Sequence, residues 1–303
     1  MNRPLTVLVL DDNPTTALGA LNYHLAASAG SADRFEMRHL SDPARLDNYL
    51  DAYRDEIDVV VIDVEFELTS TRTCLTAFDT VLRRGGPVAI GLSTSQYGRT
   101  LFPFAVCQLL PPPTGRTIVG WTYKDDRPGR GFPELVRILD AIAAGSPQAR
   151  PRTLELCTPD AAPETGAFMQ EILAGRTDVR LWSMLSRTNY EAADLAAGTS
   201  ASVSTVRKRF KKYVAAITAF EKAMQGNVVH PLGAQAVLGR PGAQEERPGK
   251  SDPTQRIVET FAHAHRTFFQ APELEEIVVA RDNRLSRLRG RRRKPGPWWT
   301  PQP

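Results

Sequence analysis

The stretch "TVLVLDDNP" at residues 6–14 joins an apolar run to two adjacent aspartates, Asp11 and Asp12. A run of Val and Leu with almost no polar alternation is typical of a strand that is buried on both faces of a parallel sheet. Two carboxylates at the end of such a strand repel each other, which costs free energy unless a cation binds between them. The stretch therefore predicts a parallel sheet with an acidic ligand site at its carboxyl edge.

Apolar runs of the same kind recur along the first half of the chain. They lie at 7–10, 59–62, 88–92 and 118–121, with a weaker candidate at 36–42. Amphipathic helical patterns lie between them, at 15–27, 43–53, 73–82 and 131–144. This alternation of strand and helix, repeated about five times, predicts an α/β fold with a doubly wound, five-stranded parallel sheet.

The charge of the chain is divided unevenly between its halves. Residues 1–150 hold 15 Lys and Arg against 18 Asp and Glu, whereas the rest holds 23 against 16. An acidic half followed by a basic half predicts that the second half meets a polyanion.

Cysteine spacing and hydropathy indicate the compartment. Cys74, Cys107 and Cys157 fit no disulfide framework or zinc spacing, which predicts reduced thiols in a cytoplasmic protein. No early apolar run approaches the roughly 20 residues of a membrane span, so neither a span nor a signal peptide is expected.

Composition divides the chain into five parts. We expect a sheet domain at 1–145, a linker at 146–166, a helical domain at 167–226, a disordered linker at 227–253, and a helical extension with a basic tail at 254–303. In the extension, a 4-3-4-3 spacing resembles a coiled-coil seam and offers a route to self-association. The positions of this seam are Leu274, Val278, Arg281, Leu285 and Leu288.

Three more strand ends carry polar residues. Asp63 follows the run at 59–62, Ser93 follows the run at 88–92, and Lys124 follows the run at 118–121. Because the carboxyl ends of parallel strands share one edge of the sheet, these side chains are expected beside Asp11 and Asp12. Three carboxylates suit a hard cation such as Mg²⁺, and a hydroxyl and an ammonium group suit a phosphoryl group. The sequence predicts a phosphoryl-handling site with one aspartate as the nucleophile.

These five residues, in this order, resemble the receiver domain of bacterial two-component response regulators, a flavodoxin-like fold. "GWTYKDD" at 120–126 is similar to the ending around the lysine of that family. The resemblance implies that Asp11, Asp12 and Asp63 bind Mg²⁺ and that Asp63 accepts a phosphoryl group. It further implies that Ser93 and Lys124 contact that group.

The same resemblance assigns a role to one aromatic residue. Trp121 lies three residues before the lysine, at the position of the mobile aromatic switch of the family. Such proteins are phosphorylated by a sensor histidine kinase, which is thereby an expected partner. The protein itself is not expected to be an enzyme beyond its own phosphorylation.

The segment "NYEAADLAAGTSASVSTVRKRFKKYV" at 189–214 predicts a helix-turn-helix. A first helix at about 190–197 would bury Ala193 and Leu195. A second helix would begin near Ser204 as its N-cap and bury Val206, Phe210 and Val214. The residues expected to contact DNA are Ser202, Ser204, Thr205, Arg207, Lys208, Arg209, Lys211 and Lys212.

"STVRKRF" at 204–210 resembles the recognition helix of LuxR-type and sigma-factor-like DNA-binding domains. The resemblance implies transcription regulation at promoter DNA, with RNA polymerase as a further expected partner. A homodimer is expected, because symmetric half-sites favour dimers.

Other interpretations remain open at this point. A receiver-like regulator could work without phosphoryl transfer. "DDNPT" at 11–15 also resembles the DxDxT motif of haloacid-dehalogenase-like phosphatases, which would make Asp11 the nucleophile. Asn13 then stands where that motif has an aspartate as general acid and base. An adaptor whose basic half binds RNA or an acidic protein is a third interpretation.

Overall fold

The computed structural model describes residues 3–15, 17–28, 34–53, 55–64, 66, 72–93, 101–111, 119–124, 131–145, 165–226 and 252–290. The chain divides into two compact units. The sheet unit comprises Met1–Thr94 and Leu110–Leu154, and the helical unit comprises Ser95–Leu109 and Glu155–Pro303.

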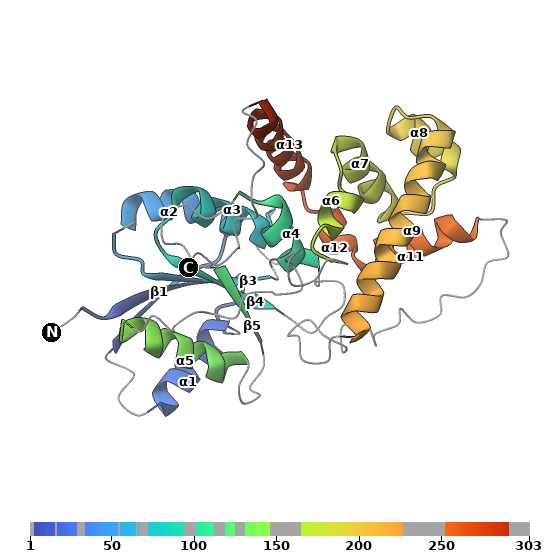
Figure 1. Ribbon diagram of the computed structural model, residues 1–303. Helices are drawn as coiled ribbons and strands as arrows, with labels where there is room; N and C mark the ends of the chain where they lie inside the picture. Colours follow the sequence, from blue (N-terminus) through green and yellow to red (C-terminus); the bar gives the residue numbers. More distant parts are fainter. Residues whose placement is uncertain are drawn as a thin grey trace. The chain divides into compact units, whose positions relative to one another are not determined.

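The sheet unit contains the predicted five-stranded parallel sheet, with the strand order β2-β1-β3-β4-β5 (Figure 1). Its strands are β1 (Leu5–Leu10), β2 (Phe35–Leu40), β3 (Val59–Asp63), β4 (Val88–Ser93) and β5 (Val119–Tyr123). The expected fold class is thereby confirmed, including the weak second strand. β1 pairs with both β2 and β3. The second strand is therefore added on one side of β1, and the third, fourth and fifth strands are added on its other side.

Helices cover both faces of the sheet, as the non-alternating strands require. α1 (Ala17–Ala27) and α5 (Gly131–Ala143) lie on one face; the short 3₁₀ helix η2 (Pro43–Arg45), α2 (Leu46–Tyr53) and α3 (Cys74–Arg84) lie on the other (Figure 1). Val7, Val9, Val59 and Val61 belong to one core cluster with Leu139 of α5. The intervening strand residues are also fully buried.

The helical unit is built around aromatic side chains. Its elements are α4 (Leu101–Leu109), α6 (Phe168–Ile172), α7 (Arg176–Leu185), α8 (Ala192–Gly198), α9 (Val203–Gly226), α11 (Pro253–Ala264), α12 (Arg266–Phe269) and α13 (Leu274–Gly290). Trp182 of α7 stacks on Phe269 with ring centroids 4.5 Å apart, and its Nε1 donates to the Ile172 carbonyl at 2.8 Å. Phe168 stacks on Phe220 of α9 at 4.3 Å.

The position of α4 differs from the sequence-based expectation, which placed residues 1–145 in a single domain. α4 lies between β4 and β5 in the sequence but belongs to the helical unit. The physical reason is its composition, because nearly all of its side chains are apolar and buried. The ring of Phe102 contacts Phe268, and that of Phe104 contacts Phe220.

The C-terminal helices also join this unit instead of forming a separate extension. Leu274 and Val278 are fully buried, Arg281 is almost so, and α13 packs against α7 and α4. The spacing that suggested a coiled-coil seam therefore reflects packing within the chain at these positions. Leu288 lies in α13, but its side chain is outside the described set.

No helix in the described part of the chain is long and apolar enough to cross a membrane.

Candidate metal and phosphoryl site and candidate DNA-binding surface

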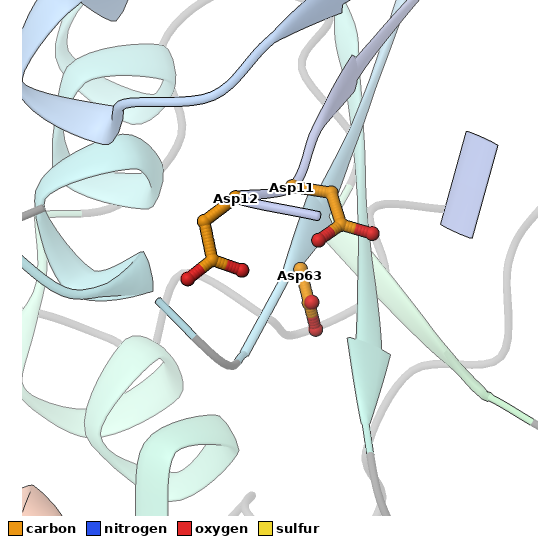
Figure 2. Close-up of side chains that lie close together, drawn as sticks. All are labelled: Asp11, Asp12 and Asp63. Carbon is orange, nitrogen blue, oxygen red and sulfur yellow. The ribbon is translucent and has the colours of Figure 1, made fainter. Parts of the chain in front are cut away.

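The fold brings Asp11, Asp12 and Asp63 together (Figure 2). Asp11 directly follows β1 and Asp63 ends β3, and the register pairs Leu10 with Ile62. Each aspartate offers one carboxylate oxygen, and these oxygens lie within 4.8 Å of one another. Asp11 and Asp63 are buried, and Asp12 is half-buried. We call these three residues the acidic cluster.

The carboxylate of Asp11 is held in place by backbone amides of its own loop. Its Oδ1 accepts from the Asn13 amide and its Oδ2 from the Ala17 amide, both at 2.8 Å. The second bond also satisfies one of the free N–H groups at the start of α1. Nε2 of His39 donates to the Asp11 carbonyl at 2.7 Å. The Asp11 carboxylate is therefore held in a fixed orientation by its surroundings.

Lys124 completes the charge pattern of the site. It directly follows β5, and its Nζ donates to Oδ2 of Asp63 in a largely buried ion pair. Ser93 is the last residue of β4 and pairs with Tyr123 in the sheet register. The backbone thus places Ser93 at the same edge, whereas its side chain lies outside the described set.

The donor set fits a hard divalent cation. Mg²⁺ prefers oxygen ligands and places opposite ligands of its octahedron about 4 Å apart. The three carboxylate oxygens lie within 4.8 Å of one another, so they could serve together as ligands of one such ion. One ammonium group from Lys124 offsets only part of the charge of three carboxylates, so a bound cation would relieve the remaining repulsion.

Trp121 lies inside the sheet unit and is almost fully buried. Its ring stacks on Phe78 of α3 with centroids 5.0 Å apart. It also covers Gly91 of β4 so closely that a Cβ there would lie 2.3 Å from a ring carbon. Among the described residues, the indole Nε1 has no hydrogen-bond partner.

In the helical unit, α8 and α9 are joined by residues 199–202. Ser202 is the N-cap of α9, because its Oγ accepts from the Thr205 amide at 3.1 Å; the prediction that Ser204 would be the cap is wrong. Ser202 Oγ lies 2.9 Å from Ser204 Oγ and 2.8 Å from Thr205 Oγ1. Ser202 and Ser204 are exposed and Thr205 is half-buried.

Two expectations for buried positions in these helices are also wrong. Ala193 is exposed, and Ala196 is buried beside Leu195 instead. In α9, Val206 and Phe210 are buried as expected, but the next buried position is Tyr213 and Val214 is only half-buried. A spacing of three at this point keeps the apolar stripe aligned with the helical period of 3.6.

The basic residues of α9 fall into two groups. Arg207, Lys208, Lys211 and Lys212 are exposed. Arg209 instead points inward, where its guanidinium donates to the buried carboxylate of Asp178 in α7.

Tyr213 completes this network by donating its hydroxyl to the same carboxylate of Asp178. Burial raises the pKa of Tyr213, and the Asp178 charge raises it further. For Arg209, burial lowers the pKa, but the nearby Asp178 carboxylate outweighs it and the pKa is raised.

Sequence reasoning missed Asp178 and Gln108. Asp178 lies 31 residues from Arg209 in the sequence, so no local pattern links them. Gln108 is buried in α4 and hydrogen-bonds the backbone of Thr165 and Met169. A lone polar residue in an apolar helix was the available signal for Gln108.

The comparisons with known proteins give little beyond this geometry. No protein-family model matches the chain, and no curated protein matches it. The matching solved structures include the RcsB response regulator of Salmonella typhimurium, described for its conformational dynamism for DNA interaction. The sequences are 14% identical, the match covers 72% of this chain and 93% of that chain, and the TM-score is 0.36. At that TM-score, the match carries no argument about function.

Proposed function

We propose that the protein is a DNA-binding response regulator, a transcription factor whose sheet unit binds Mg²⁺ and accepts a phosphoryl group on Asp63. The helix-turn-helix of its helical unit would bind promoter DNA, as a homodimer. A sensor histidine kinase and RNA polymerase would be its protein partners.

One observation carries this proposal. The acidic cluster and Lys124, distant in sequence, meet at the carboxyl edge of a parallel sheet, and the chain continues into a helix-turn-helix with an exposed basic face. A carboxylate paired with an ammonium group beside two further carboxylates suits transfer of an anionic group.

The chain's own residues would divide the chemistry as follows. Asp11 and Asp12, with Asp63, would hold Mg²⁺, which would offset the charge of the incoming phosphoryl group. A carboxylate oxygen of Asp63 would attack phosphorus as the bond to the donor's leaving group breaks, leaving an acyl phosphate. Lys124 would shift from the Asp63 carboxylate to a phosphoryl oxygen, and Ser93 would contact the same group.

On the DNA side, the two groups of basic residues would have different roles. Arg207, Lys208, Lys211 and Lys212 would contact phosphates or base edges from the exposed face of α9. Ser202, Ser204 and Thr205 would lie at the helix end that enters the major groove. Arg209 would act chiefly through Asp178, by fixing the orientation of α9.

One alternative to this proposal is a regulator that works without phosphoryl transfer. Another is a phosphatase with Asp11 as the nucleophile. Both oxygens of Asp11 accept backbone amide hydrogen bonds, which suits a fixed metal ligand better than an attacking group. The phosphatase alternative also leaves the Lys124–Asp63 pair without a role.

The test is peptide mapping by mass spectrometry after incubation with Mg²⁺ and acetyl phosphate, on the wild type and Asp63→Asn. We expect one phosphoryl group on Asp63, absent from the variant. A phosphoryl group on Asp11 would support the phosphatase alternative. No adduct with acetyl phosphate or with purified histidine kinases would overturn phosphoryl acceptance and favour the phosphorylation-independent regulator.

A further inference from the structure

In the sequence, α4 lies between two strands of the sheet unit, but it packs within the helical unit. β4 ends at Ser93 and β5 begins at Val119, so both ends of α4 lead back along the chain to strands of the sheet. The ordinary outcome for a crossover helix is to cover the sheet between its own two strands. Its membership of the other unit therefore needs a specific cause.

Apolar burial supplies part of that cause. Of the nine residues of α4, all except Cys107 are buried. Phe102 meets Phe268 edge to face at 5.4 Å, and Phe104 meets Phe220 of α9 at 5.1 Å. A helix that is buried around its whole circumference is a core element of the unit that surrounds it.

Polar contacts fix the position of α4 along its axis. Nε2 of Gln108 donates to the Thr165 carbonyl, and its Oε1 accepts from the Met169 amide, both at 2.8 Å. Arg284 of α13 donates to the Leu109 carbonyl at 2.7 Å, which satisfies a backbone group at the end of α4. Sliding α4 by one turn would break these bonds and leave buried polar groups without partners, which is costly.

We propose that α4 is a docking helix that the helical unit recognises, so that the chain before residue 146 stays bound to the chain after residue 164 even when the peptide backbone between them is cut. The contacts made by α4 are those of a helix held in an apolar site, with Gln108 as the residue that sets its register. The proposal does not depend on phosphoryl transfer or on DNA binding.

The test uses the full-length chain with a protease site inserted between residues 150 and 155. The folded protein is cut, and the product is analysed by size-exclusion chromatography with light scattering. We expect both fragments to elute together as a one-to-one complex that survives dilution to about micromolar concentration. Separation of the wild-type fragments in native buffer would overturn the proposal.

A matched pair of variants assigns the binding to α4. Gln108→Ala removes both hydrogen bonds to the second fragment and should weaken association at least about tenfold. Cys107→Ser, on the same helix but half-buried, should stay within about twofold of wild type. Arg284→Met removes the hydrogen bond that the second fragment donates to the Leu109 carbonyl of α4, and it should also weaken association. This variant provides the test if Gln108→Ala fails to fold. Equal association in all four proteins would show that something other than α4 holds the fragments together.

Discussion

At the scale of single residues, the three carboxylates of the acidic cluster repel one another, and hydrogen bonds and an ion pair hold two of them in place. Asp11 is held by two amide donors and Asp63 by the ammonium group of Lys124, whereas Asp12 is the most exposed of the three. Of the three aspartates, Asp12 should therefore be the one whose neutralisation disturbs the fold least. The change would still remove one ligand of the proposed metal site.

We predict that Asp12→Asn raises the free energy of unfolding in EDTA by about 1 kcal/mol, because it relieves repulsion among like charges. The same change should remove most of the stabilisation that Mg²⁺ gives the wild type by mass action. Urea denaturation with and without Mg²⁺ measures both effects.

The control is Asp58→Asn. Asp58 lies just before β3, at the opposite end of this strand, and accepts bonds from Arg3 and from the Thr6 amide at 2.9 Å. This variant should lose some stability but keep the full response to Mg²⁺. Equal Mg²⁺ responses in wild type and Asp12→Asn would count against the metal site.

A second residue-scale prediction concerns alkaline pH. The folded-state pKa of Tyr213 lies above its unfolded value of about 10, because of burial and then Asp178. Its contribution to stability is therefore complete below pH 10 and is lost as the pH rises from there toward the folded pKa. Between roughly pH 9 and pH 11, Tyr213→Phe should lose less unfolding free energy than wild type. The same pH dependence of the unfolding free energy in wild type and Tyr213→Phe would contradict this assignment.

At the scale of elements, the strands and the edge site were predictable because their signals are local. Val59–Asp63 is an unbroken buried run ending in a carboxylate, and the parallel sheet then determines where Asp63 lies. The inward turn of Arg209 was not predictable, because its partner Asp178 is on another helix. The start of α9 at Val203 depends on which of several serines accepts the first free amide, a matter of one or two residues.

Gly91 of β4 gives a test of the packing around Trp121. A Cβ at this position would lie 2.3 Å from the indole ring, so Gly91→Ala must displace the ring from Phe78. We expect a loss of about 1–3 kcal/mol in unfolding free energy and red-shifted tryptophan fluorescence. The red shift should vanish in a Trp121→Phe background.

A glycine with room for a methyl group is the control for this substitution. In Gly19→Ala the nearest atom to the new Cβ is the Pro14 carbonyl oxygen at 3.8 Å, and the residue lies inside α1. This change should raise stability by up to about 1 kcal/mol. Unaltered fluorescence in Gly91→Ala would contradict the observed position of Trp121.

The two groups of basic residues on α9 should separate by their effects. Lys208→Ala, on the exposed face, should weaken duplex DNA binding. It should also reduce the magnitude of the slope of log K against log salt concentration by about one. Arg209→Ala leaves the buried Asp178 without its cation and should cost about 2 kcal/mol or more in stability, with the salt slope unchanged. Binding titrations at several salt concentrations, together with urea unfolding, distinguish these outcomes. A reduced salt slope in Arg209→Ala and an unchanged slope in Lys208→Ala would indicate that Arg209, and not Lys208, contacts the DNA.

At the scale of the whole molecule, the two compact units are interleaved in sequence. The chain leaves the sheet at Ser93, contributes α4 to the helical unit, and returns to the sheet at β5, which precedes Lys124. A pattern-based division at residue 145 could not show this, because the partners of α4 lie 57 to 175 residues later, at Thr165 and in α6, α9, α12 and α13. In the sequence, β4, whose carboxyl end lies at the edge of the acidic cluster, is thus followed by a core helix of the helical unit.

The most direct measurement is the affinity of the full-length protein for a duplex selected from random sequence, with and without Mg²⁺ and acetyl phosphate. The wild type should bind the selected duplex, and its dissociation constant should change at least about fivefold on phosphorylation, the lower end of typical coupling energies. Asp63→Asn should bind with one affinity under both conditions. Equal affinities for phosphorylated and unphosphorylated wild type, or no preference for any duplex, would contradict a regulator in which Asp63 controls DNA binding.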